Sequence, residues 1–250
     1  MMKYALAFAT ALVAAAPALA EDTPLPKLGP NAVPISVDHA YLTEAPAPDF
    51  WAIFPFVKPQ FTSSACGVAS ITAAVTALAG LPPHAEDTVI RQPELLEKVG
   101  DAHWTAISAE EGDGIMFDEL SLYAGKAAEA MGLKVTIDSF HPGAPGAMPE
   151  AAALTELRAR LAANEASAND VTMVYFNQGV VTGDWDGPHV SLIGAYDARR
   201  DRVLILEVDQ EWYIPYWTPV PVLLTAITRP APDDQGVLKG QTGGLVRLSR

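Results

Sequence analysis

The sequence predicts an α+β domain in which a helical first half packs on an antiparallel sheet formed by the second half. Between residues 66 and 166, apolar residues recur at spacings of three and four, as on a helix with one buried face. From residue 169, runs rich in β-branched residues are separated by turn signals, as in neighbouring strands. Helices and strands that come in blocks, rather than alternating, favour α+β over α/β.

The first twenty residues have the form of a secretory signal peptide. Lys3 precedes an apolar run, which ends at the small-residue sequence Ala18-Leu19-Ala20. The run is shorter than the ~20 residues that a membrane-spanning helix needs. We therefore expect cleavage after residue 20, a periplasmic or secreted protein, and no stable membrane insertion once the signal is removed.

The rest of the chain is expected to divide into an extended, proline-rich and acidic segment (21–50) and one folded domain (51–250). An alanine-rich helix begins near Cys66 and ends at Gly80, before two prolines. A short helix is expected at the end of "WTPVPVLLTAIT", and Asp197–Asp201 is expected to turn between two strands. The helical stretches expected are 66–80, 86–111, 117–133 and 150–166, and the strands are 134–140, 171–179, 189–197, 202–210 and 244–250.

Composition excludes several classes of function. The chain has 16 Lys and Arg against 30 Asp and Glu, and its formal net charge is −14. This excess of acid argues against nucleic acid or an anionic membrane as partner, because no basic stripe is present to neutralise phosphates. With one cysteine, no intramolecular disulfide and no cysteine-rich metal site is expected. The sequence predicts no metal ligands and leaves the oligomeric state open.

That one cysteine, Cys66, lies where a loop is expected to become a helix. A helix N-terminus favours a thiolate, and Gly67 lets other backbone approach closely. The candidate base is His189, which begins a strand after a Gly-Pro turn. The alternative is that Cys66 is a buried structural residue. The other histidines lie in polar or proline-rich loops and are expected to be solvated or capping: His39, His84, His103 and His141.

A histidine base needs an acceptor to orient it. If the chain folds back across the Asp197–Asp201 turn, His189 faces both Glu207 and Asp209, and the period of two places both acids on its face of the sheet. The alternation of side chains along the strand therefore does not distinguish Glu207 from Asp209. Gln60, six residues before Cys66, is a candidate oxyanion donor, a role worth ~3 kcal/mol in a transition state. Glutamine, cysteine, histidine and acid follow in the chain order of papain-like enzymes.

Three stretches resemble the phytochelatin synthase family, papain-like enzymes that act on glutathione. They are "QFTSSACGVAS", "GIMFDELSLYAGKAAEAMGLKV" and "GPHVSLIGAYDARRDRVLILEVDQEWYIPYWTPV". The resemblance covers residues from about 54 to 250 and implies a papain-like cysteine-protease fold. The cysteine-rich C-terminal region of the plant enzymes is absent, so the chain resembles the short bacterial members.

The resemblance implies a role for each candidate residue. Cys66 takes the position of the nucleophile, His189 that of the base and Gln60 that of the oxyanion donor. The family carries aspartate where this chain has Glu207, and Asp209 is the alternative third residue.

The implied activity is that of a glutathione γ-glutamylcysteinyltransferase or hydrolase. A Cys66 acyl-enzyme would release glycine from glutathione, or from a related γ-glutamyl thiol peptide, and give γ-glutamylcysteine and phytochelatins. No cofactor is implied beyond activation by a metal-thiolate form of the substrate, which is a metal response. The family's Arg-Gly pair is replaced by Gly243-Gly244, and the candidates to supply the missing charge are Arg229, Arg247 and Lys58.

Two other functions stay open. In the first, the protein is a papain-like peptidase that acts on another peptide substrate. In the second, it is a periplasmic binding protein whose active site has decayed. The aromatic run "WYIPYWTP" fits either core packing or a ligand platform. The acids Asp184 and Asp186, with "EVDQE", fit either a solvated surface or a cation site.

Overall fold

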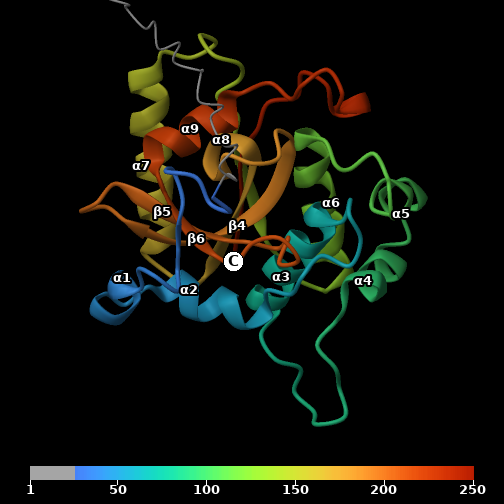
Figure 1. Ribbon diagram of the computed structural model, residues 1–250. Coiled ribbons are helices and arrows are strands. Elements are labelled where there is room, and N and C mark those ends of the chain that lie inside the picture. Colours follow the sequence, from blue (N-terminus) through green and yellow to red (C-terminus); the bar gives the residue numbers. More distant parts are fainter. Residues whose placement is uncertain (1–25) are drawn as a thin grey trace, which may run out of the picture.

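The computed structural model describes residues 26–250, so the predicted signal peptide lies outside the described residues. A seven-stranded antiparallel sheet runs through the molecule in the order β1-β6-β5-β4-β3-β7-β2. Helices cover both of its faces (Figure 1). The α+β prediction is confirmed. The strands are β1 (Val33–Pro34), β2 (Thr136–Phe140), β3 (Asp170–Asn177), β4 (Pro188–Asp197), β5 (Arg202–Leu206), β6 (Tyr216–Pro219) and β7 (Gly244–Ser249).

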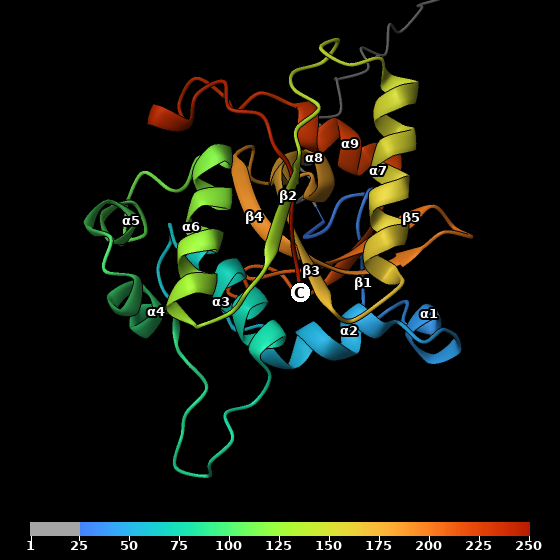
Figure 2. The ribbon, with the colours of Figure 1, turned by 180° about the vertical axis from the view of Figure 1, so that it is seen from behind.

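Most helices precede the strands of the central sheet in the chain. The helices are α1 (Ala40–Glu44), α2 (Pro48–Ile53), α3 (Cys66–Ala79), α4 (Gln92–Val99), α5 (Ala102–Ile107), α6 (Phe117–Ala130), α7 (Glu150–Glu165), α8 (Gln178–Thr182) and α9 (Val220–Thr228), with 3-10 turns η1 (Phe54–Phe56) and η2 (Gly236–Leu238). Figure 2 shows α3, α4 and α6 on one side of the sheet and α7 and α9 on the other. No helix within residues 26–250 has the length and the apolar character needed to cross a membrane.

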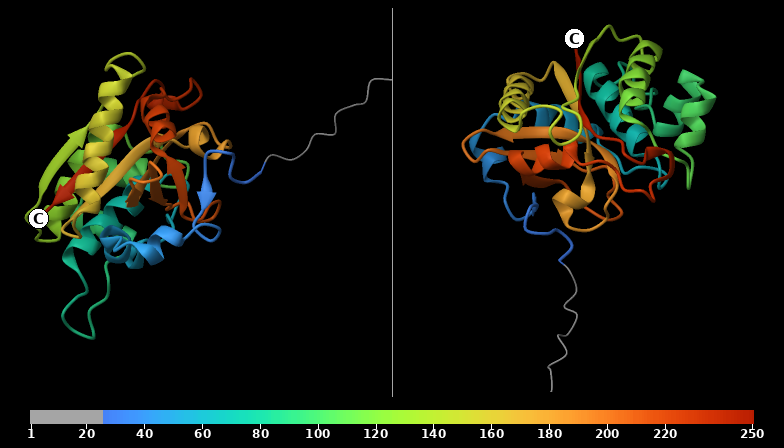
Figure 3. Two further views of the ribbon diagram at one scale, coloured as in Figure 1. Left: turned by 90° about the vertical axis from the view of Figure 1, so that its left-hand side faces the viewer. Right: turned by 90° about the horizontal axis from the view of Figure 1, so that it is seen from above.

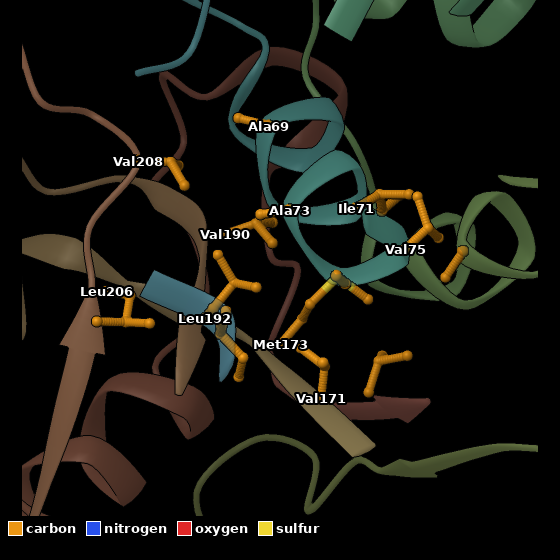
Figure 4. Close-up of a cluster of buried hydrophobic side chains, with 14 of the residues drawn as sticks. Ala69, Ile71, Ala73, Val75, Val171, Met173, Val190, Leu192, Leu206 and Val208 are labelled. Atoms are coloured by element: carbon orange, nitrogen blue, oxygen red, sulfur yellow. The ribbon is translucent and has the colours of Figure 1, made fainter. Parts of the chain in front are cut away.

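The helix that begins at Cys66 packs directly on the centre of the sheet. Its alanines, among them Ala69 and Ala73, are buried against Val190 and Leu192 of β4 (Figure 4). Alanine side chains are short, so the helix axis lies close to the strand. The N-terminus of α3 is therefore held beside the start of β4.

A β-bulge shapes the hairpin between β4 and β5. The register shifts between Ile193 and Ala195. A Cβ on the intervening Gly194 would lie 2.5 Å from Cγ of Leu206, so only glycine fits there. The strand expected over 202–210 in fact ends at Leu206.

Two further segments differ from expectation. The N-terminal segment expected to be extended also contains α1 and the first half of α2, because Pro48 starts a helix readily and Phe50 is buried in the core. Its short strand β1 pairs with β6 at the edge of the sheet (Figure 3). Within 86–111, residues up to 91 belong to a loop that projects from the body of the molecule (Figure 1), and Gly100, at φ 69°, ends α4 before α5 begins.

Candidate active site

Cys66 is the first residue of α3 and is half-buried. The loop before it is held in place by the Ser64 hydroxyl, which donates a hydrogen bond to the carbonyl oxygen of Gly112 at 2.6 Å. A Cβ on Gly67 would lie 2.8 Å from the Ile115 side chain. Glycine thus lets the segment around Ile115 pack against the start of the helix. These contacts leave the thiol on the wall of a cavity.

His189 lies near the start of β4 and is only 4% exposed. One turn into α3, the Ser70 hydroxyl donates to the carbonyl oxygen of Val190 at 3.1 Å. This hydrogen bond joins the cysteine helix to the histidine strand at the residue next to His189. The helix and the strand therefore bring Cys66 and His189 to the same cavity.

A fully buried carboxylate lies behind the histidine. Glu207 Oε1 is 2.6 Å from His189 Nε2, and the Ser191 hydroxyl donates to the same oxygen at 3.1 Å. The other oxygen, Oε2, accepts from Gln178 Nε2 at 3.2 Å and from the Tyr216 hydroxyl at 3.1 Å. Glu207 is thus held by side-chain donors from strands β4 and β6 and from helix α8.

Glu207 reaches His189 because β5 ends one residue earlier. The backbone N–H groups of Val208 and Asp209 both donate to Glu207 Oε1 at 2.8 Å. If the strand continued, these two N–H groups would lie in the plane of the sheet and point toward neighbouring strands. The turn of the chain after Leu206 therefore accommodates the longer side chain of glutamate.

The charges of His189 and Glu207 support each other. Burial by itself lowers the pKa of His189, but the charge of Glu207 and hydrogen bonding with Cys66 and Glu207 together hold it well above its usual value. Burial raises the pKa of Glu207, but the charge and hydrogen bond of His189 bring it below its usual value. The pair is therefore imidazolium and carboxylate at neutral pH. Glu207 engages Nε2, so Nδ1 is the ring nitrogen left for the thiol.

Asp209 and Gln60 line the same cavity. The Asp209 carboxylate makes no hydrogen bond with His189 among the residues described, and burial raises its pKa. Of the two acids that parity admitted, the structure brings Glu207 into contact with the histidine. Gln60 is anchored by its backbone N–H, which donates to the Val208 carbonyl oxygen at 2.8 Å, and its side-chain amide donates only a long 3.4 Å hydrogen bond, to Ser63.

Several residues of the site were missed from the sequence. The cavity has a volume of about 500 Å³, and Tyr175 on its wall is 2% exposed, with a hydroxyl that has no partner in the described part of the chain. Ser191 had a usable signal, since the period of two places it on the face of His189. The sequence carried no signal for Gln178 and Tyr216, because their distance from Glu207 depends on how β4, β5, β6 and α8 pack together.

The charge expected to replace the family's arginine is not in the cavity. A Cβ on Gly243 would lie 1.8 Å from the Tyr175 carbonyl oxygen, so no side chain fits there with this backbone. None of the three candidate cations lines the cavity. Arg229 pairs with Asp186, Arg247 pairs with Asp170, and Lys58 donates to the Pro55 carbonyl oxygen.

The other four histidines do not line the cavity either. His103 Nε2 lies 2.7 Å from Glu119 Oε1, and His141 Nε2 lies 2.7 Å from the Thr242 hydroxyl.

A cysteine at a helix N-terminus, a histidine on an adjoining strand and a buried acid behind the histidine are the arrangement of papain-like cysteine enzymes. This geometry suits cysteine-dependent acyl transfer. The phytochelatin synthase family model matches residues 28–237, and the chain belongs to this family. Membership supports a γ-glutamylcysteine transferase function with glutathione as substrate. No curated protein matched the chain.

Proposed function

We propose that the protein cleaves the cysteinyl-glycine bond of glutathione through a γ-glutamylcysteinyl thioester on Cys66. Family membership supports the substrate. The observation that carries the proposal is the contact of His189 with buried Glu207, on the wall of the cavity that also holds Cys66. An imidazolium that is held charged beside a thiol favours the thiolate, which is the nucleophilic form.

Acylation uses the groups around Cys66. The Cys66 sulfur adds to the carbonyl carbon of the substrate's cysteine residue and forms a tetrahedral intermediate. The Gln60 amide and the free N–H groups at the start of α3 stabilise its oxyanion. His189 then gives its proton to the glycine nitrogen, the C–N bond breaks, and glycine leaves. Glu207 stabilises the imidazolium before that transfer.

Deacylation sets the product. Water that attacks the thioester, with His189 taking its proton, gives γ-glutamylcysteine and returns the thiol. The α-amine of a second glutathione gives a phytochelatin in the same way. A metal ion takes part only as the thiolate complex of the substrate. The signal-like form of residues 1–20 supports action in the periplasm or outside the cell.

The test is incubation of the purified protein with glutathione, with and without cadmium or zinc, and identification of products by mass spectrometry. Glycine and γ-glutamylcysteine, both lost in Cys66→Ala, are the expected products of hydrolysis. Longer γ-glutamylcysteine oligomers would add the synthase activity. Intact glutathione, together with rapid alkylation of Cys66, would overturn the substrate and favour a peptidase with another substrate. Intact glutathione with a slow thiol would favour a decayed site.

Matched variants test the individual roles. Gln60→Ala is expected to lower kcat by about 10²–10³-fold with little change in KM, because an oxyanion donor acts in the transition state. Glu207→Gln is expected to lower kcat/KM more than Asp209→Asn does. The reverse order would assign the orienting role to Asp209.

A further inference from the structure

The mouth of the Cys66 cavity is acidic. Three carboxylates line it, those of Asp113, Asp184 and Asp209. No lysine or arginine of the described chain lines it. This lining is unfavourable for an anionic group and favourable for a cation.

One side of this mouth is built as a receptor for an ammonium group. The Lys27 ammonium lies 4.4 Å from the ring centroid of Trp212 and 4.9 Å from that of Tyr213. It is also 3.9 Å from Asp184 Oδ2, and the Tyr213 hydroxyl donates to the same oxygen at 2.9 Å. Two aromatic faces and a carboxylate thus surround one positive charge. All three receptor residues line the cavity, and Lys27 does not.

Lys27 reaches this place from the N-terminal segment. The segment is fastened two residues later, where the Gly29 N–H donates to the Thr182 carbonyl oxygen at 2.6 Å. The lysine side chain is itself 51% exposed and that of Asp184 is 50% exposed. An exposed ion pair of this kind is held weakly, so another cation can displace it.

We propose that Asp184, Trp212 and Tyr213 form a subsite for an alkylammonium group of the substrate, and that Lys27 occupies this ammonium subsite in the free protein. The assignment to substrate rests on the proposed function. Two parts of a γ-glutamyl peptide can carry the charge. One is the α-ammonium of the γ-glutamyl residue on the acyl side, and the other is an amine on the leaving group.

Asp209 connects the ammonium subsite with the reacting groups. Its side chain lines the same cavity. Burial raises its pKa, while the positive charges of His189 and Lys27 lower it, so both charges lie within electrostatic reach of this one carboxylate. Cys66 and the three residues of the subsite line one cavity of about 500 Å³, so a cation bound in the subsite can belong to the molecule that reacts at Cys66.

The first experiment measures the charge selectivity of Cys66 and needs no turnover. Because Cys66 is the only cysteine in the chain, thiol reagents report on this site alone. The reagents are 2-aminoethyl methanethiosulfonate, a cation, and 2-sulfonatoethyl methanethiosulfonate, an anion. Each forms a mixed disulfide with the thiol and releases methanesulfinate. The ratio of the two rate constants is divided by the ratio for a free cysteine derivative.

We expect this corrected ratio to favour the cation, and Asp184→Asn to lower it by about 3–10-fold. Trp212→Ala, at a side chain that is 60% exposed, is expected to lower it without disturbing the fold. Asp87→Asn removes the same charge from the projecting loop and is the control for the overall field. Equal effects of Asp184→Asn and Asp87→Asn would overturn the proposal.

The variant Lys27→Gln distinguishes two roles of Lys27: occupying the ammonium subsite in the free protein, and binding a carboxylate of the substrate. If Lys27 occupies the subsite, its removal speeds the cationic reagent by about 3–10-fold, beyond the effect of the control Lys98→Gln on α4. If Lys27 instead serves to bind a substrate carboxylate, Lys27→Gln slows the anionic reagent and leaves the rate of the cationic reagent equal to that in Lys98→Gln. That second result would overturn the proposal.

The second experiment finds which part of the substrate enters the subsite. Values of kcat/KM are compared for glutathione, N-acetylglutathione and the 3-aminopropylamide of glutathione, in the native protein and in Asp184→Asn. A penalty for N-acetylation that disappears in the variant assigns the subsite to the γ-glutamyl ammonium. A preference for the aminopropylamide that disappears in the variant assigns it to the leaving group. If all three substrates stay intact while the Asp184-dependent reagent selectivity persists, the proposed function fails and the ammonium subsite stands. If the native protein and Asp184→Asn turn over all three substrates with equal kcat/KM values, the ammonium subsite is overturned.

Discussion

Replacing Glu207 with glutamine removes a charge from behind His189 and changes little else. Glu207 Oε1 and His189 Nε2 are 2.6 Å apart, and both side chains are buried. With an effective dielectric constant of about 20, Coulomb's law gives about 6 kcal/mol as the ceiling for this attraction. The net contribution of a hydrogen bond to a charged group is smaller, about 1.5–3 kcal/mol, because neutral groups are cheaper to bury than charged ones. A loss of ~2 kcal/mol lowers the pKa of His189 and slows the reaction of the Cys66 thiol by about 30-fold.

The hydrogen bonds around residue 207 can survive the change. The amide oxygen keeps the contact with His189, and the amide NH₂ then faces Tyr216 and Gln178. A tyrosine hydroxyl can accept as well as donate, and the Gln178 amide can turn its oxygen inward. The variant therefore reports on charge, with the fold retained.

Alkylation of Cys66 by iodoacetamide is the assay, followed between pH 4 and 9. The native protein is expected to react rapidly across the neutral range, because charged His189 supports the thiolate. In Glu207→Gln we expect the rate at pH 6–7 to fall by about 30-fold and to recover only in alkali. Tyr216→Phe removes one hydrogen bond from Glu207 and keeps the charge, and its rate should fall less than about threefold. Equal losses in the two variants, or no loss in Glu207→Gln, would refute the electrostatic reasoning.

Two further predictions concern stability. Burial, with the charges of Asp170 and Glu165, raises the pKa of Asp49 to about 9, so the folded chain holds a proton that the unfolded chain releases above about pH 4. Stability should therefore fall between pH 5 and 9 by up to about 1.4 kcal/mol per pH unit, and Asp49→Asn should flatten this slope and be the more stable protein above pH 7. Urea unfolding of the native protein and of Asp49→Asn at pH 5, 7 and 9 measures this pH dependence. The same dependence of the unfolding free energy on pH in the two proteins would contradict the burial argument. Gly194→Ala should destabilise by about 1–3 kcal/mol, since its Cβ would lie 2.5 Å from the Leu206 side chain. Gly125→Ala, inside α6 with only an isoleucine tip at 3.3 Å, should be neutral or stabilising, and equal effects of the two would contradict the account of the bulge.

The parts of the site that lie on regular elements could be predicted from the sequence. An apolar run with glycine and proline after it located α3, and a Gly-Pro turn before a β-branched run located the start of β4. These signals are local, and they placed Cys66 and His189 at element starts. The long loop before α4 was missed because its charged residues fit a helix as well as a loop.

No local sequence pattern distinguishes Glu207 from Asp209 as the partner of His189, because the difference depends on where β5 ends. Strand parity treats Glu207 and Asp209 alike, because it assumes that β5 continues through both. The strand ends at Leu206, and this depends on the bulge at Gly194 and on the donors that converge from β4, β6 and α8.

The end of β5 also bears on whether the site has decayed. Glu207 accepts hydrogen bonds from six groups, including two backbone N–H groups that the end of the strand makes available. A carboxylate with no role would be expensive to keep charged and fully buried in this way. The same turn also holds the loop before Cys66, because the Val208 carbonyl oxygen accepts from the Gln60 backbone N–H. The glutamate, the histidine and the glutamine are thus positioned by one turn of the chain, and this favours a working site that adapted to the longer acid over a site in decay.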